Sequence, residues 1–173
     1  ACSVSTTGPV PLTPGQTAKI LSNGNAAAPS GIPGNAGKIV KAIIAAGNEI
    51  DSKSYLEQHY GPLSEIWPTY DCSGSTSYVL YKAGLHSVNA QVSGELESWG
   101  EPGPGKYLTI YANSKHVFVS VAGIAFNTAW YISSTEIHPN PPTSGPRWQP
   151  GSTVPEQLAG DPNGFVARHW AGM

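Results

Sequence analysis

Residues 106–131 read KYLTIYANSKHVFVSVAGIAFNTAWY, and this stretch decides the fold. β-Branched and aromatic residues recur in it with the two-residue period of strands, and short segments rich in small or polar residues interrupt them. We therefore expect three antiparallel strands, at Tyr107–Tyr111, His116–Val121 and Ile124–Tyr131.

The turn between the second and third strands predicts a register. If Ala122 and Gly123 form this turn, residues whose numbers sum to 245 face each other, so position 118 opposes Asn127. Side chains two residues apart on a strand share a face. His116 and Asn127 are then diagonal neighbours on one face of the hairpin.

Helical patterns precede the strands. Apolar residues recur at helical spacing in 35–48, and further helices are expected at 72–83 and 92–99. Asn35 is the predicted cap of the first helix, and Gly47-Asn48 is its predicted stop.

Helices followed by a meander of strands indicate an α+β fold. We expect N-terminal helices packed on an antiparallel sheet of about five strands, with a closing strand at Gly164–His169. Residues 138–163 contain seven prolines, so neither a central strand nor a helix is expected there. Residues 1–33 contain five prolines and one charged residue, which predicts a flexible or wrapped arm before a domain at 34–173.

Composition excludes several classes of function. The net charge is −2 and Lys and Arg do not cluster, so no nucleic-acid partner is expected. The longest apolar helical stretch, Ile39–Ala46, is too short to cross a bilayer. Two cysteines are too few to predict a disulfide framework. The sequence contains neither a CxxC nor an HExxH pattern, so no metal site is predicted. We expect a monomer without cofactors, in which Cys2 is an inert thiol or, alternatively, a lipid-anchored first cysteine.

Cys72 is the candidate nucleophile. It follows Asp71 at the predicted start of a helix, where unsatisfied N–H groups and the helix dipole favour a thiolate. The same N–H groups are suited to hold the oxyanion of a tetrahedral intermediate. We therefore expect a thiol with a lowered pKa, paired with a base.

His116 is the candidate base and Asn127 the candidate orienting residue. An amide at position 127 can accept a hydrogen bond from one imidazole nitrogen and so direct the other nitrogen at the thiol. This arrangement is a Cys-His-Asn catalytic triad. His138 is an alternative to Asn127 as the third residue. Of the other histidines, we expect His59 to border the active-site cleft. We expect His86 to lie in a loop and His169 to be structural or at the surface.

Several of these residues together resemble a known family. Asp71-Cys72-Ser73-Gly74, a helix ending in Ala83-Gly84-Leu85, and a strand from His116-Val117 to Ala122-Gly123 resemble the NlpC-type cell-wall cysteine peptidases. The similarity covers roughly residues 36–130. The segments 99–105 and 145–148 resemble a subgroup of secreted actinobacterial members.

The resemblance implies a papain-like fold and hydrolysis of amide bonds in peptidoglycan stem peptides, commonly between γ-D-glutamyl and a diamino acid. It implies a protein that is secreted or held in the cell envelope. Cys72 then matches the nucleophile, His116 the base and Asn127 the third polar residue. The resemblance further assigns substrate binding to Tyr55, Asp71 and Ser73.

The chain departs from the family pattern at residues 56–61, where an aromatic residue and consecutive glycines are usual. His59 is expected to take over part of what that glycine segment does. Two other functions stay open: an amidase or acyltransferase of the same fold acting on another substrate, and a non-catalytic wall-binding module.

Overall fold

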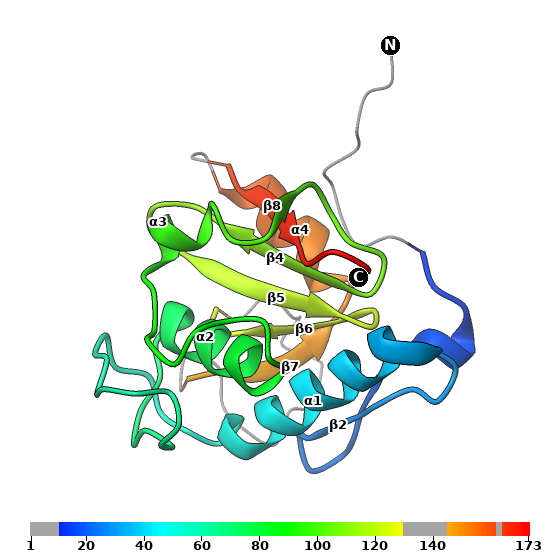
Figure 1. Cartoon of the computed structure of the whole chain (residues 1–173), viewed down its shortest axis with the longest axis horizontal. Coiled ribbons are helices and arrows are strands. Elements are labelled where there is room, and N and C mark those ends of the chain that lie inside the picture. Colours follow the sequence, from blue (N-terminus) through cyan, green and yellow to red (C-terminus); the bar gives the residue numbers. More distant parts are fainter. Residues whose placement is uncertain (1–10, 130–144, 162–163) are drawn as a thin grey trace.

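The computed structural model describes residues 11–129, 145–161 and 164–173. They form an α+β fold in which helices pack on a six-stranded antiparallel sheet (Figure 1). The strand order is β3-β8-β4-β5-β6-β7, and a separate two-stranded sheet pairs β1 with β2. The strands span β1 Lys19–Ile20, β2 Ala26–Ala27, β3 Glu101–Pro102, β4 Leu108–Ala112, β5 Val117–Val121, β6 Ile124–Asn127, β7 Arg147–Pro150 and β8 Val166–His169.

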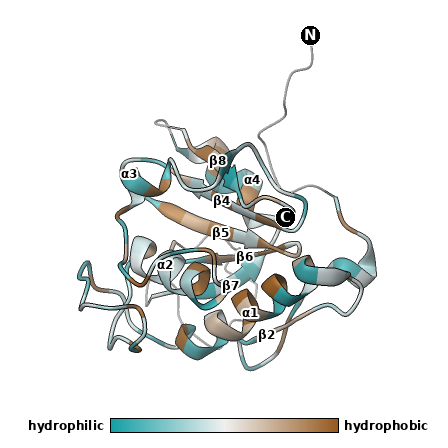
Figure 2. Ribbon diagram, viewed as in Figure 1, coloured by the Kyte–Doolittle hydropathy of each residue, from teal (hydrophilic) through white to brown (hydrophobic). Residues whose placement is uncertain are grey.

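The two faces of the sheet carry separate cores. Helices α1 (Gly34–Ile50) and α2 (Cys72–Lys82) cover one face, where they bury alternate strand residues such as Val119 and Val121. Helix α4 (Thr153–Gly160) packs on the other face, against Phe118 and its neighbours. Because both faces are covered, β4, β5 and β6 are buried throughout. Figure 2 shows β5 as strongly hydrophobic, whereas α1 alternates between hydrophobic and hydrophilic residues.

The predicted hairpin register is confirmed. Val121 pairs with Ile124 and Val119 with Phe126, so the paired numbers sum to 245 as expected. Ala122 and Gly123 both have positive φ angles, 47° and 81°, as a two-residue type I′ turn requires. The third strand ends at Asn127, before the predicted end at Tyr131, which lies outside the described residues.

The predicted ends of the first helix are wrong. Pro33, not Asn35, is the N-cap, and the helix continues through Gly47-Asn48 to Ile50. A Cβ atom on Gly47 would lie 2.3 Å from a ring carbon of Trp148, so this glycine permits close packing. The Asn48 amide oxygen accepts from the indole N–H of Trp148 at 2.9 Å and from the Ala26 N–H at 2.8 Å. Both residues therefore serve tertiary contacts that local sequence cannot reveal.

The proline-rich segment is more ordered than predicted. Part of it forms β7, an edge strand that brings the sheet to six strands instead of about five. Helix α4 contradicts the expectation that this segment holds no helix. Pro155 lies in its first turn, where the absent N–H would have had no helical partner in any case. The remaining predicted helix is short, with α3 spanning Ser93–Leu96.

The described part of the N-terminal arm is wrapped on the body. The Ala18 N–H donates to the Ala122 carbonyl at 2.8 Å, and the Ala18 side chain is buried. Within the described ranges, no helix is both long and apolar enough to span a membrane. Cys2 and His138 lie outside the described residues.

Candidate active site

Helix α2 begins at Cys72, and the preceding residue explains why. The Asp71 backbone is extended, and its carboxylate accepts a hydrogen bond from the Gly74 N–H at 2.6 Å. An N-cap carboxylate satisfies a donor that the first turn leaves free and complements the positive end of the helix dipole. The local sequence thus positions Cys72 as the first residue of the helix.

The Cys72 thiol lies where α2 meets the start of β5. The thiol is free and only 8% of the residue is exposed. The backbone N–H groups of Val117, Ser73 and Cys72 itself lie near the sulfur and act to lower the pKa of the thiol. Val117 directly follows His116, so the start of α2 lies next to the residue that follows the predicted base.

The expectation of a lowered Cys72 pKa is wrong for the protein without substrate. Burial raises the pKa of the Cys72 thiol to about 11, and the negative charge of Asp71 adds to the rise. The surrounding N–H groups lower this pKa, but they do not offset the desolvation of a thiolate. The resting sulfur is therefore a protonated thiol at neutral pH.

His116 and Asn127 form the predicted diagonal pair. The His116 Nε2 lies 2.9 Å from the Asn127 Oδ1. The Ala129 N–H also donates to this Oδ1, at 3.0 Å, which fixes the amide oxygen on that side. Since an amide oxygen only accepts, Nε2 carries the proton and Nδ1 keeps its lone pair. Nδ1 makes no hydrogen bond within the described chain, so it is available as a base.

Burial of the His116 ring lowers its pKa below the usual range. The hydrogen bond to Asn127 and the charge of Asp161 act in the opposite direction, but burial is the larger effect. The ring stacks on Phe118, with 6.0 Å between ring centroids, and meets the edge of Phe165. His116 is therefore held as a neutral imidazole in a fixed orientation.

Gln157 is a functional candidate that the sequence did not reveal. Its amide oxygen accepts a hydrogen bond from the Asn127 Nδ2, and Gln157 is only 3% exposed. It comes from α4, in the proline-rich segment where no helix was expected. No local motif marks this glutamine, because its partner lies 30 residues earlier in the chain.

A second polar cluster lies at the start of α2. The His59 Nε2 lies 3.0 Å from the Ser73 hydroxyl and 3.3 Å from the Asp71 carboxylate. The Ser73 hydroxyl also donates to Asp71, at 3.2 Å, and the His59 ring packs against Trp67. His59, Asp71 and Ser73 thus come together, and their visible role is to brace the start of α2.

Tyr55 borders the same region. Together with His116, Thr128 and Ala129 it lines a hollow of about 270 Å³. Burial raises the Tyr55 pKa to about 12, and the next contribution is its proximity to Cys72. Tyr55 is 39% exposed and its hydroxyl donates to the Glu57 carboxylate at 3.4 Å, so the phenol oxygen is left to accept a hydrogen bond from a ligand in this hollow.

His86 and His169 lie elsewhere. His86 bonds to Gln91, and His169 bonds to the Gly103 carbonyl at 2.9 Å. Within the described ranges, no group of three or more His, Cys, Asp or Glu side chains is placed to hold a metal ion.

No protein-family model matches this chain, and no curated protein matches it significantly.

Proposed function

We propose that the protein is a cysteine peptidase that hydrolyses amide bonds in peptidoglycan stem peptides. One observation carries the proposal. The hydrogen bond to the Asn127 amide oxygen leaves the His116 Nδ1 unprotonated. His116 directly precedes Val117, whose backbone N–H lies near the Cys72 sulfur. A neutral base next to a protonated thiol is a competent resting state for nucleophilic catalysis.

In the proposed mechanism, the Cys72 sulfur attacks the scissile carbonyl carbon while Nδ1 of His116 takes the thiol proton. The N–H groups at the start of α2 stabilise the oxyanion. His116 then gives the proton to the leaving amine as the C–N bond breaks. A water molecule, deprotonated by His116, hydrolyses the resulting thioester and returns the free thiol.

The substrate class rests on the resemblance to NlpC-type peptidases. In that family the bond cut is commonly the one between γ-D-glutamyl and a diamino acid. The exposed Tyr55 beside the 270 Å³ hollow supports binding of a short peptide there. Asp71 and Ser73 are proposed to hold polar groups of the stem peptide; both residues are buried, and neither lines the hollow.

The test is digestion of purified cell walls by the full chain and by Cys72→Ala, with masses of the released fragments. We expect stem-peptide fragments from the first protein and none from the second, whose fold circular dichroism would verify. Equal release by both proteins would contradict the thiol mechanism. Thiol-dependent activity that cuts no stem peptide would favour the amidase or acyltransferase alternative.

One observation favours a second candidate, a non-catalytic wall-binding module. The Cys72 thiol is buried and its pKa is raised to about 11, which is the behaviour of a structural cysteine. Sedimentation with cell walls in the absence of any released fragment would support this candidate over the peptidase.

A further inference from the structure

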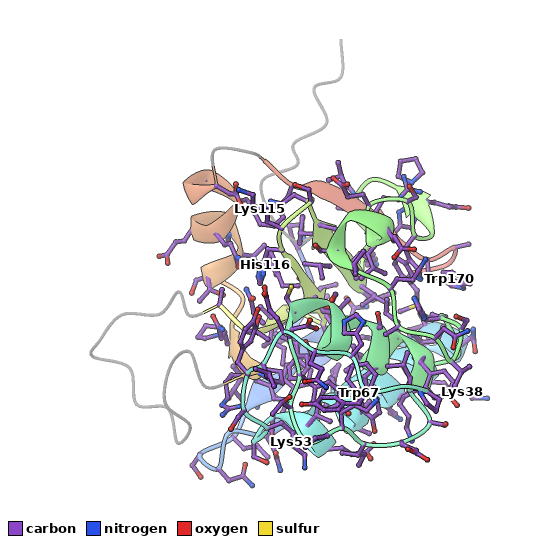
Figure 3. All side chains as sticks on the ribbon, turned by 90° about the vertical axis from the view of Figure 1, so that its left-hand side faces the viewer. Lys38, Lys53, Trp67, Lys115, His116 and Trp170 are labelled. Atoms are coloured by element: carbon purple, nitrogen blue, oxygen red, sulfur yellow. The ribbon has the colours of Figure 1, made fainter. Side chains whose placement is uncertain are left out.

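An open hollow of about 650 Å³ lies at the opposite end of α2 from Cys72. Its walls come from the loop after α2, from the segment around α3 and from the residues after β8. Figure 3 shows Trp170, which lines this hollow, and His116 at opposite sides of the molecule in that view. The hollow is therefore separate from the candidate active site.

The aromatic wall of the hollow is built in two layers. Trp99 is 7% exposed, and its indole N–H donates to the Leu85 carbonyl at 2.9 Å. Trp170 packs on Trp99 with 5.4 Å between ring centroids, and it is only half-buried. Trp99 thus supports Trp170, which keeps part of its ring open to the hollow.

The wall is held in place before any ligand binds. The Arg168 guanidinium donates to the carbonyls of Trp99 at 2.7 Å and Gly100 at 2.8 Å. The Met173 N–H donates to the Trp170 carbonyl, and the Met173 carbonyl accepts from the Tyr107 N–H. A preformed wall lowers the entropic cost of binding.

The polar side chains of the hollow are mostly uncharged. Asn89 and Gln91 supply amides, and Glu95 supplies one carboxylate, while no Lys or Arg is among the described residues that line it. The Gln91 oxygen bonds to His86 at 2.8 Å, and its amide nitrogen makes no hydrogen bond within the described chain. This nitrogen is available to donate to a ligand. The absence of cations from the lining disfavours phosphate or nucleic acid.

We propose that this hollow binds a pyranose sugar of an N-acetylated glycan strand. The apolar C–H face of the ring would stack on Trp170, because indole offers a flat apolar surface. The Asn89 and Gln91 amides and the Glu95 carboxylate would pair with hydroxyl and N-acetyl groups. The identity of the glycan as cell-wall glycan rests on the proposed function, whereas binding of the sugar does not require catalysis.

The test is a titration of the Cys72→Ala full chain with β-1,4-linked N-acetylglucosamine tetrasaccharide, followed by the NMR signals of the indole N–H groups. We expect saturable binding that shifts the Trp170 signal. Adding Trp170→Ala should weaken binding by at least about tenfold, whereas Trp170→Phe should retain most of it.

Tyr60→Ala is the matched control, since Tyr60 is an exposed aromatic residue that does not line the hollow. This variant should bind as tightly as its parent. Absence of binding by the folded parent, or binding lost with Tyr60→Ala and kept with Trp170→Ala, would overturn the inference. Sugar binding without wall cleavage by the protein that retains Cys72 would leave the inference intact and remove the proposed function.

Discussion

Two histidines flank the start of α2, and their surroundings differ. His116 donates from Nε2 to a neutral amide oxygen, and that amide is itself oriented by Ala129 and Gln157. His59 directs its Nε2 at both a carboxylate and a hydroxyl, those of Asp71 and Ser73.

The difference indicates different tasks. A neutral acceptor sets the tautomer of an imidazole and stabilises its positive charge less than a carboxylate would, so the other nitrogen keeps its lone pair. The His59 nitrogen instead joins a group of side chains whose remaining bonds cap a helix. We therefore propose that His116 transfers the proton and that His59 supports the start of the helix.

The largest expected effect separates these two histidines directly. His116→Ala should lower kcat for wall cleavage by about a thousandfold, because a positioned general base contributes on the order of 10² to 10⁴. His59→Ala should change kcat by less than about tenfold. Comparable losses of kcat in two folded variants would refute the assignment.

Replacing the neutral acceptor would make the two sites more alike. Asn127→Asp presents a carboxylate to His116, which should raise the pKa of this histidine. Because the base must be deprotonated, the acidic limb of the kcat profile should move to higher pH. Asn127→Ala should instead lower kcat by about a hundredfold at all pH values, since it removes the orienting bond.

Replacing Gln157 should have a smaller effect on the His116–Asn127 pair. Gln157→Leu keeps the volume but removes the acceptor for the Asn127 Nδ2, which loosens the amide that orients His116, so we expect kcat to fall by about tenfold with KM unchanged. Gln157→Glu retains an oxygen acceptor and should recover most of the lost activity. A loss confined to thermal stability would mean that Gln157 has only a structural role.

The chemistry of the thiol can be measured without any substrate. Since the Cys72 pKa is raised to about 11, its alkylation rate should keep rising with pH well past the ordinary thiol pKa of about 8.5. Iodoacetamide labelling across pH, read by mass spectrometry at Cys72, gives the profile. A plateau reached at or below neutral pH would reveal a resting thiolate and contradict the effect of burial.

The smallest expected effect concerns the helix start. Asp71→Ala removes the N-cap acceptor for Gly74 and should lower the free energy of unfolding by about 1 kcal/mol. Asp71→Asn keeps an acceptor and should recover most of this loss. Urea denaturation of the two variants measures the difference, and equal stabilities would show that the cap does not depend on the side-chain oxygen.

The hairpin and the nucleophile helix could be predicted because their determinants are local. A two-residue turn at Ala122-Gly123 admits one register, and that register brings His116 to Asn127. Asp71 before a run of small residues similarly predicts where α2 begins. Gln157 could not be predicted, because nothing near it in the chain indicates that α4 packs across the sheet from α2.

By itself, the sequence determined the α+β class, the turn that aligns His116 with Asn127, and the position of Cys72 at a helix N-terminus. Only the tertiary structure decided that α2 delivers Cys72 to Val117, that Gln157 orients Asn127, and that burial outweighs the helix N-terminus in setting the thiol pKa. The physical reason is the distance along the chain between the residues that interact. Periodicity, turns and caps depend on a few neighbouring residues, whereas desolvation and side-chain pairing depend on which distant segments the packed core brings together.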